Sequence, residues 1–234
     1  MKDSGRDFVV AASRPGYEAM TRRLARDLGR RFHLVSRPEE LTPAFLKERN
    51  PELVFLPHWS TIIPAAVHEN FECVVFHMTD LPYGRGGSPL QNLIARGHTE
   101  TRLSALRCTA QLDAGPIYLK KDLSLAGSAR EIFARGALLV EEMIREIIAT
   151  RPRPVPQEGR AVVFKRRVPA QSNLAGLTEV GKIHDHIRML DADGYPHAFL
   201  EVAGLRYEFT DSRLEDGAVE ARVRIVPTNR EESP

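Results

Sequence analysis

The stretch from Cys73 to Asn92, CVVFHMTDLPYGRGGSPLQN, decides how the fold of this chain is interpreted. It begins with an apolar run, Cys73 to Phe76, that has the length of a strand buried on both faces of a sheet. After His77 the composition changes to a loop rich in glycine and proline. Ligands of parallel α/β sheets bind beyond the carboxyl ends of the strands, so His77 lies where a site is expected. A histidine that is hydrogen-bonded inside a tight loop explains the same position equally well.

Short runs of β-branched and aromatic residues alternate with helical patterns around this stretch. Runs at 8–12, 32–35 and 53–56 predict further strands, and the spacing of Tyr17, Met20, Leu24 and Leu28 predicts an amphipathic helix. N-cap and capping-box patterns predict helices after Thr42, Ser88 and Ser128. The alternation predicts an α/β fold, with a Rossmann-like and mostly parallel sheet.

The composition changes again after the long helix that begins near Ser128. Residues 151–156, RPRPVP, cannot continue a helix and predict an extended connector. One predicted helix (180–190) and three strand-like runs (199–202, 207–209 and 221–225) follow. We therefore expect a first domain over residues 1–158 and a small α+β C-terminal appendage over residues 159–234.

The overall charge and apolar content exclude several classes of protein. Thirty-three Lys+Arg against thirty-one Asp+Glu leave a formal net charge of +2, which gives no broad positive field, so no nucleic-acid partner is expected. No apolar run of about 18 residues occurs, so no membrane partner is expected, and the start MKDSGRDFVV does not resemble a signal peptide. Cys73 and Cys108 show no metal-ligand spacing and are expected as reduced thiols. These features predict a cytoplasmic globular protein without a metal.

A second segment, Asp113-Ala114-Gly115, is by itself typical of a turn. Together with the 73–92 stretch it resembles the folate-dependent formyltransferase superfamily, which includes methionyl-tRNA, glycinamide-ribotide and amino-sugar formyltransferases. The family pattern is Asn-x-His, a small hydroxyl residue, Leu-Pro, a glycine loop and Pro, then Asp-x-Gly. The matching stretches here are Val75-Phe76-His77, Thr79, Leu81-Pro82, Arg85-Gly86-Gly87, Pro89 and Asp113-Ala114-Gly115. Weaker resemblance continues at 164–169 and 187–199, which look like segments behind the catalytic domain of sugar and tRNA formyltransferases.

This resemblance implies the formyltransferase fold, an N-formyltransferase activity and N10-formyltetrahydrofolate as the formyl donor. An amine that attacks a formyl carbonyl needs one group to polarise the oxygen and another to take up its proton. The resemblance assigns these catalytic roles to His77 and Asp113. It assigns cofactor binding to Arg85, Gly86 and Gly87.

The chain departs from the family at Val75, where the family has a carbonyl-polarising asparagine. Valine has no side-chain donor, and the loss of one such donor typically lowers the rate by ~10²–10³-fold. His58 follows the preceding predicted strand and is our candidate third catalytic residue, because it would leave the sheet at the same edge as His77. Asp80 is a second candidate, as a partner for a substrate ammonium. The structural alternatives are that His58 caps a turn beside Trp59 and that Asp80 bonds local backbone.

From these observations we expect formyl transfer to a small-molecule amine, most of all a nucleotide-linked amino sugar. Arg85 and Lys165–Arg167 are the basic groups that the resemblance places nearest to its phosphates, although a solvated strand edge is the more usual interpretation of Lys165–Arg167. A tRNA substrate is disfavoured, because the chain has no room for the large basic C-terminal domain that tRNA formyltransferases carry. The alternatives are a hydrolase that releases formate from the same folate and a folate-binding module without catalysis. The sequence leaves the oligomeric state open, with a homodimer as one option.

Overall fold

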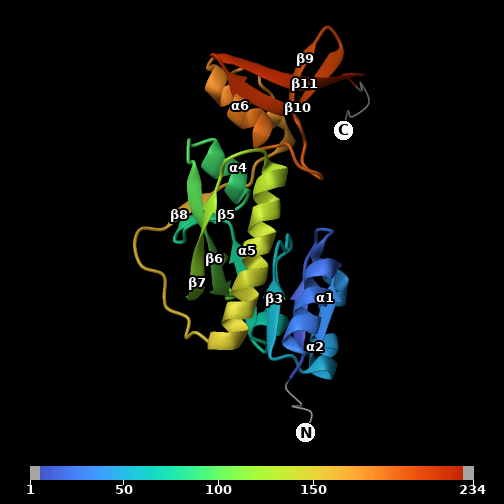
Figure 1. The fold of residues 1–234 in the computed structure, drawn as a ribbon, viewed down its shortest axis with the longest axis vertical. Coiled ribbons are helices and arrows are strands. Elements are labelled where there is room, and N and C mark those ends of the chain that lie inside the picture. Colours follow the sequence, from blue (N-terminus) through green and yellow to red (C-terminus); the bar gives the residue numbers. More distant parts are fainter. Residues whose placement is uncertain (1–5, 229–234) are drawn as a thin grey trace. The chain divides into compact units, whose positions relative to one another are not determined.

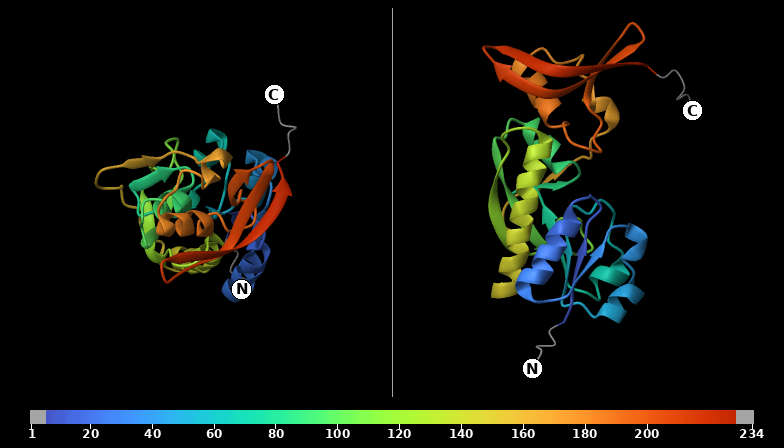
Figure 2. Two further views of the ribbon diagram at one scale, coloured as in Figure 1. Left: turned by 90° about the horizontal axis from the view of Figure 1, so that it is seen from above. Right: turned by 45° about the vertical axis from the view of Figure 1, so that its right-hand side comes forward.

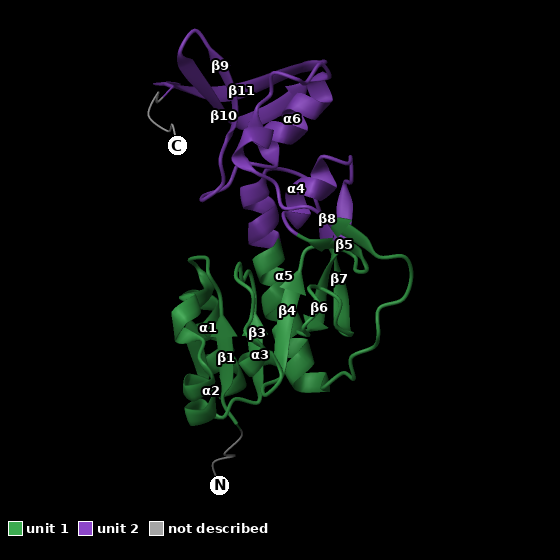
Figure 3. Cartoon of the chain, turned by 180° about the vertical axis from the view of Figure 1, so that it is seen from behind, with its two compact units in different colours: residues 1–86, 102–122, 136–163 green, residues 87–101, 123–135, 164–234 purple. Residues whose placement is uncertain are grey.

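The computed structural model describes residues 6–228 of the chain (Figure 1). The chain forms two compact units, one of residues 1–86, 102–122 and 136–163, the other of residues 87–101, 123–135 and 164–234 (Figure 3). Four elements, β6, β7, β8 and α5, continue from one unit into the other. The expected boundary between residues 158 and 159 stays a prediction.

A six-stranded sheet with the order β2-β1-β3-β4-β6-β7 is built largely from the first unit. Its strands are β1 (Phe8–Ala11), β2 (Phe32–Val35), β3 (Leu53–Leu56), β4 (Cys73–His77), β6 (Glu100–Arg107) and β7 (Ile117–Ser124). The first four pair in parallel, whereas β6 runs antiparallel to β4. Every residue of β1 and β3 is buried, as strands covered on both faces require. The predicted mostly parallel α/β sheet is confirmed.

The helices of the first unit are α1 (Tyr17–Leu28), α2 (Pro43–Arg49), α3 (Ala65–His68) and most of α5 (Ala129–Thr150); a short 3₁₀ turn lies at Pro38–Glu40. The predicted cap of α2 is present, since the Thr42 hydroxyl accepts the Phe45 amide at 3.1 Å. Helices α1 and α5 lie side by side on one face of the sheet (Figures 1 and 2). Arg23 of α1 donates to Glu141 of α5 at 3.1 Å, and Arg145 of α5 donates to Asp27 at 2.9 Å.

Two pairs of strands were not predicted. Strands β6 and β7 carry charged residues among their apolar ones, as at Lys120, Lys121 and Asp122, so no continuous apolar run marks them. Strands β5 (Tyr83–Gly86) and β8 (Val162–Phe164) form a separate two-stranded sheet. Residues 152–156 of the predicted connector (151–156) contain no helix, and Val155 forms a β-bridge with Ile117.

The second unit holds α4 (Pro89–Ile94), a 3₁₀ turn at Pro169–Ser172, α6 (Val180–Arg188), β9 (Ala198–Val202), β10 (Leu205–Glu215) and β11 (Ala218–Pro227). The last three strands form an antiparallel sheet of order β11-β10-β9. Ile187 of α6 and Phe199 of β9 are buried. The predicted small α+β architecture at the C-terminal end is confirmed.

The two predicted serine caps have different outcomes. Ser88 precedes α4 but has a left-handed backbone with φ 49° and makes no cap bond; its hydroxyl accepts the Arg167 amide at 3.0 Å instead. At α5 the capping box is present, because the Ser128 hydroxyl accepts the Glu131 amide at 3.3 Å and the Glu131 carboxylate accepts the Ser128 amide at 2.8 Å. A cap-like sequence therefore does not determine which backbone amide donates to the serine hydroxyl.

Three further features concern residues 6–228 alone. None of the helices there is long and apolar enough to cross a membrane. No group of three or more His, Cys, Asp or Glu side chains in that range is arranged to hold a metal ion. Cys73 and Cys108 are both free thiols.

The capping box of α5 gives a stability prediction. Ser128→Ala removes the hydroxyl acceptor of the Glu131 amide and should lower the free energy of unfolding by about 1 kcal/mol. Urea-induced unfolding, followed by circular dichroism, measures the change. An unfolding free energy equal to that of the wild type would show that the box does not stabilise the helix.

Candidate active site

His77 ends strand β4 and is almost fully buried, with 7% of its surface exposed. Its Nε2 lies 2.7 Å from the carbonyl oxygen of Gly84 in β5. A carbonyl oxygen only accepts, so this contact requires a proton on Nε2. The tautomer is thus assigned from the hydrogen bond, and Nδ1 is left as the ring nitrogen that can gain or lose a proton.

Asp113 faces that second nitrogen. Its Oδ2 lies 3.6 Å from Nδ1 of His77 and accepts the Gly86 amide at 2.9 Å. The Asp113 backbone is left-handed, with φ 50°, a conformation that aspartate adopts more readily than most residues. The structure therefore brings the predicted His77 and Asp113 together from two segments of the first unit.

The turn that carries Asp113 is packed tightly against strand β6. A Cβ atom added to Gly115 would lie 1.8 Å from the carbonyl oxygen of Arg107, so only glycine fits there. This close approach is the physical reason for the glycine in the Asp113-Ala114-Gly115 turn. It fixes how far the turn stands from the sheet.

Arg85, expected to contact the cofactor, has a different contact in the structure. Its Nε and Nη2 donate to Oε1 of Gln157 at 3.1 and 2.7 Å. Gln157 in turn donates from Nε2 to the carbonyl oxygens of Asp113 and Gly115, both at 2.9 Å. Gln157 was missed by the sequence analysis, since a lone glutamine in a proline-rich connector gives no signal.

The two loop glycines are also engaged within the chain. The Gly86 amide donates to Asp113, and the Gly87 amide donates to the Phe164 carbonyl at 3.1 Å. A Cβ at Gly87 would lie 2.6 Å from the Cα of Arg166, so close backbone packing accounts for this glycine. Cofactor binding by Arg85, Gly86 and Gly87 stays a prediction.

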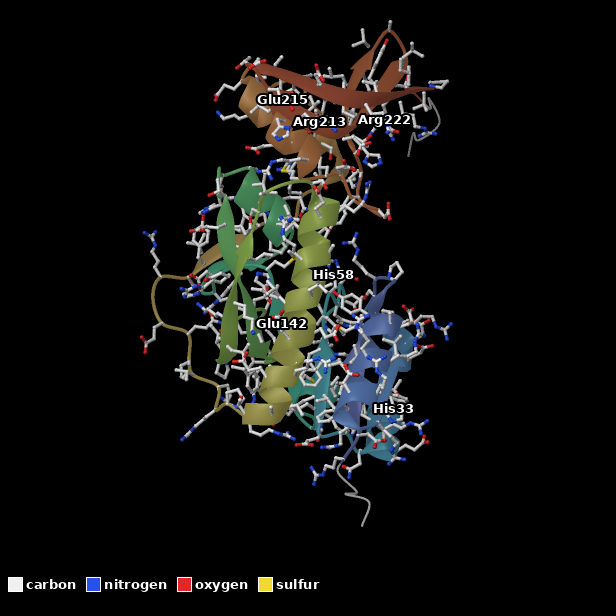
Figure 4. All side chains as sticks on the ribbon, viewed as in Figure 1. His33, His58, Glu142, Arg213, Glu215 and Arg222 are labelled. Carbon is white, nitrogen blue, oxygen red and sulfur yellow. The ribbon has the colours of Figure 1, made fainter. Side chains whose placement is uncertain are left out.

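His58 lies in the loop that follows β3 (Figure 4). The register of the parallel strands pairs Leu56 with Val75, so His58 and His77, each two residues further along, leave the sheet at the same edge. Burial, with a smaller contribution from the Arg14 charge, lowers the pKa of His58 to about 4. The imidazole is therefore neutral at pH 7 and can still donate one hydrogen bond.

Asp80 and Thr79 have structural partners. The Asp80 carboxylate pairs with the Lys120 ammonium, so its charge is already balanced within the protein. The backbone of the same loop is fastened to β6, since the Ser104 hydroxyl donates to the Thr79 carbonyl at 2.7 Å. The partner of the Asp80 carboxylate is thus Lys120 of β7 rather than the local backbone, and contact of Asp80 with a substrate ammonium stays a prediction.

The basic segment 165–167 belongs to the second unit. Lys165 and Arg166 are exposed, whereas Arg167 is half-buried. The Arg167 guanidinium donates to the Gln171 carbonyl at 2.6 Å, and burial together with the Arg96 charge lowers the pKa of Arg167. Arg96 is held by the Asn92 side chain at 2.8 Å and lies over the Phe164 ring. The segment thus gathers several positive charges near one another.

Two family models match the chain, "Formyl transferase" over residues 24–131 and "Methionyl-tRNA formyltransferase, C-terminal domain" over residues 169–226. A solved methionyl-tRNA formyltransferase from Clostridium thermocellum is 41% identical and covers 96% of this chain and 100% of its own, with a TM-score of 0.92. The chain belongs to the formyltransferase superfamily. That family uses N10-formyltetrahydrofolate as the formyl donor.

More distant formyltransferases extend the comparison. A methionyl-tRNA formyltransferase from Dichelobacter nodosus is 23% identical over 184 residues, covering 74% of this chain and 59% of the relative. The chain thus spans little more than half the length of the first curated formyltransferases that it matches, 59% and 51% for two of them. A sugar N-formyltransferase from a Shewanella species is 13% identical with a TM-score of 0.66, which shows the shared fold.

These comparisons correct two expectations. The small-molecule acceptor, a nucleotide-linked amino sugar, and the absence of a nucleic-acid partner are both wrong, because residues 169–226 match the C-terminal domain of methionyl-tRNA formyltransferase. The argument from size assumed that this domain must be large and basic. Here α6 and the three-stranded sheet make up the matching region in a short chain.

The buried, neutral His58 predicts how stability depends on pH. Its pKa is 6.5 when unfolded and about 4 when folded, so between these values the unfolded chain takes up a proton that the folded chain resists. The free energy of unfolding should therefore fall as the pH drops from 6.5 to 4, by at most about 3 kcal/mol for this group.

His58→Asn removes this group and keeps a residue that tolerates the left-handed φ of 52° at that position. We expect the unfolding free energy of the variant to depend less steeply on pH across that range, in urea titrations at pH 4.5, 5.5 and 6.5. Parallel pH profiles for the two proteins would contradict a neutral, buried His58.

Proposed function

We propose that this chain transfers the formyl group of N10-formyltetrahydrofolate to the α-amino group of methionine carried on tRNA. The observation that carries the proposal is the match of residues 169–226 to the C-terminal domain of methionyl-tRNA formyltransferase. A methionyl-tRNA formyltransferase that covers nearly the whole chain at 41% identity supports it. The proposed reaction would take place in the cytoplasm, where charged tRNA is used.

The reaction requires a hydrogen-bond donor for the formyl oxygen and a base for the amine proton. As the amine attacks, negative charge develops on the formyl oxygen and the attacking nitrogen must lose a proton. A cationic imidazole beside a carboxylate suits both needs, because the carboxylate favours the imidazolium and can take up a proton. The buried His77 and Asp113 side chains fit the formyl donor in this respect.

His77 is proposed to polarise the formyl oxygen through Nδ1–H. Its Nε2 proton is committed to the Gly84 carbonyl, so Nδ1 is the nitrogen free to exchange a proton during the reaction. The 3.6 Å separation of Nδ1 from the Asp113 carboxylate is longer than a hydrogen bond. In the proposal, Nδ1–H is therefore not committed to Asp113 and donates to a substrate oxygen without a change in the ring orientation, while Asp113 receives the amine proton.

His58 is proposed to supply the donor that Val75 cannot. His58 and His77 follow the ends of neighbouring strands, and a neutral imidazole carries one N–H. A neutral donor also avoids placing a second positive charge beside the His77 imidazolium.

For tRNA, the exposed Lys165 and Arg166 are the proposed phosphate contacts. Three of the four arginines of the C-terminal sheet suit this role less well, because they pair with neighbouring carboxylates. Arg206 pairs with Glu201, and Arg224 pairs with Glu208. The basic segment of the second unit therefore offers the positive charge that phosphates need.

The function is tested directly with purified protein, N10-formyltetrahydrofolate and methionyl-tRNA. We expect formyl-methionyl-tRNA to accumulate, and Asp113→Asn to lower kcat by at least ~10²-fold with an unchanged circular dichroism spectrum, because the amide cannot accept the amine proton. In parallel reactions, tRNA without methionine or a nucleotide-linked amino sugar replaces methionyl-tRNA as the acceptor.

Formate release that does not need methionyl-tRNA, formylation of the sugar alone, or folate binding without turnover would each overturn the proposed function. Turnover of a folded Asp113→Asn protein near the wild-type rate would overturn the role of Asp113.

The tRNA contact predicts an electrostatic effect. Reversing both exposed charges, Lys165→Glu with Arg166→Glu, should raise the KM for methionyl-tRNA about tenfold and lessen its dependence on salt, because fewer counterions are released on binding. The KM for the folate should stay the same. Arg22→Glu, an exposed reversal on α1, is the control. Equal salt dependence in the double variant and the wild type would remove this segment from the tRNA interface.

A further inference from the structure

Gln157 follows the proline-rich connector, and its side chain donates two hydrogen bonds to the turn that carries Asp113. It is half-buried, while its neighbours 158–160 are exposed. Both halves of its amide are used: Nε2 donates twice and Oε1 accepts twice. A half-buried amide that is fully hydrogen-bonded in this way restrains the groups around it.

The groups that Gln157 holds belong to two separate segments. On one side lie the carbonyls of Asp113 and Gly115, the two ends of the turn, each 2.9 Å from Nε2. On the other side lies Arg85, between Gly84 and Gly86 in strand β5. The Gly84 carbonyl accepts a hydrogen bond from Nε2 of His77, and the Gly86 amide donates one to the Asp113 carboxylate. The Gln157 amide thus connects the backbone that orients Asp113 to the strand that orients His77.

The backbone conformation of the Asp113 turn is unfavourable without further contacts. Asp113 has a left-handed backbone, which is less favourable for a residue with a Cβ than the right-handed or extended regions. Its carboxylate is held by the Gly86 amide at one point only among the hydrogen bonds of the described residues. A second restraint on the Asp113 carbonyl limits rotation of the whole residue, and with it the position of Oδ2 relative to Nδ1 of His77.

We propose that Gln157 is a positioning residue for formyl transfer, which keeps the Asp113 carboxylate on His77 by clamping the Asp113 turn to Arg85. The proposal rests on the proposed function for its catalytic consequence. The geometric part, that Gln157 holds the turn against β5, is independent of which substrate the enzyme uses.

The test uses two variants of the full chain and a matched control. Gln157→Ala removes the whole clamp, whereas Gln157→Glu keeps the size and a partner for Arg85 but removes the two Nε2 donors. Glu158→Gln makes the reverse exchange at the exposed neighbouring residue. Because the Gly86 amide donates to Asp113, its hydrogen exchange, measured by NMR, reports how firmly the turn is held. The amide of Val54, which bonds within the sheet, serves as the reference for global stability.

We expect the Gly86 amide to exchange about tenfold faster in both Gln157 variants, with the Val54 amide unchanged and both amides unchanged in Glu158→Gln. In the transfer assay kcat should fall about tenfold in both Gln157 variants, with the KM values for folate and methionyl-tRNA within about twofold of the wild type, since positioning acts in the transition state.

Wild-type exchange at Gly86 in the Gln157 variants overturns the clamp, and faster exchange with an unchanged kcat overturns its role in catalysis. If the wild-type protein fails to formylate methionyl-tRNA, the proposed function fails, while the exchange experiment still decides whether Gln157 holds the turn.

Discussion

Much of this site depends on the hydrogen bond that the imidazole of His77 donates to the Gly84 carbonyl. It fixes which ring nitrogen holds a proton and so directs the other nitrogen toward Asp113. Strand β5 then contributes three successive contacts: the Gly84 carbonyl to His77, the Arg85 side chain to Gln157, and the Gly86 amide to Asp113. One short strand thereby orients both members of the proposed catalytic pair.

Strand β6 supports this arrangement from the sheet. Ser104 holds the loop behind His77 through the Thr79 carbonyl, and the Arg107 carbonyl lies so close to Gly115 that the Asp113 turn can approach no further. The histidine loop and the aspartate turn are therefore positioned by the same antiparallel neighbour of β4. A rigid strand sets relative positions more precisely than two independent loops would.

The parts of this fold that could be predicted from sequence are those with a strong local signal. Apolar runs predicted β1 to β4, and the resemblance to formyltransferases pointed to His77 and Asp113, whose Nδ1 and Oδ2 atoms lie 3.6 Å apart in the structure. The partners of Arg85 and Ser88 could not be predicted, because Gln157 and the Arg167 amide meet them only through the tertiary fold. Strand β6 has no continuous apolar run, and its role was missed. The acceptor was misjudged because size and net charge describe a whole chain, whereas the match that corrected it lies in residues 169–226.

The most direct test of this arrangement is to determine which ring nitrogen of His77 carries the proton. Long-range ¹H–¹⁵N correlation spectra of histidine-labelled protein, with His77 assigned by comparison with His77→Asn, show which ring nitrogen carries the proton at high pH. If Nε2 donates to the Gly84 carbonyl, the neutral imidazole carries its proton on Nε2 and Nδ1 is unprotonated. A neutral His77 protonated on Nδ1 would contradict it, because Nε2 could then not donate to the Gly84 carbonyl.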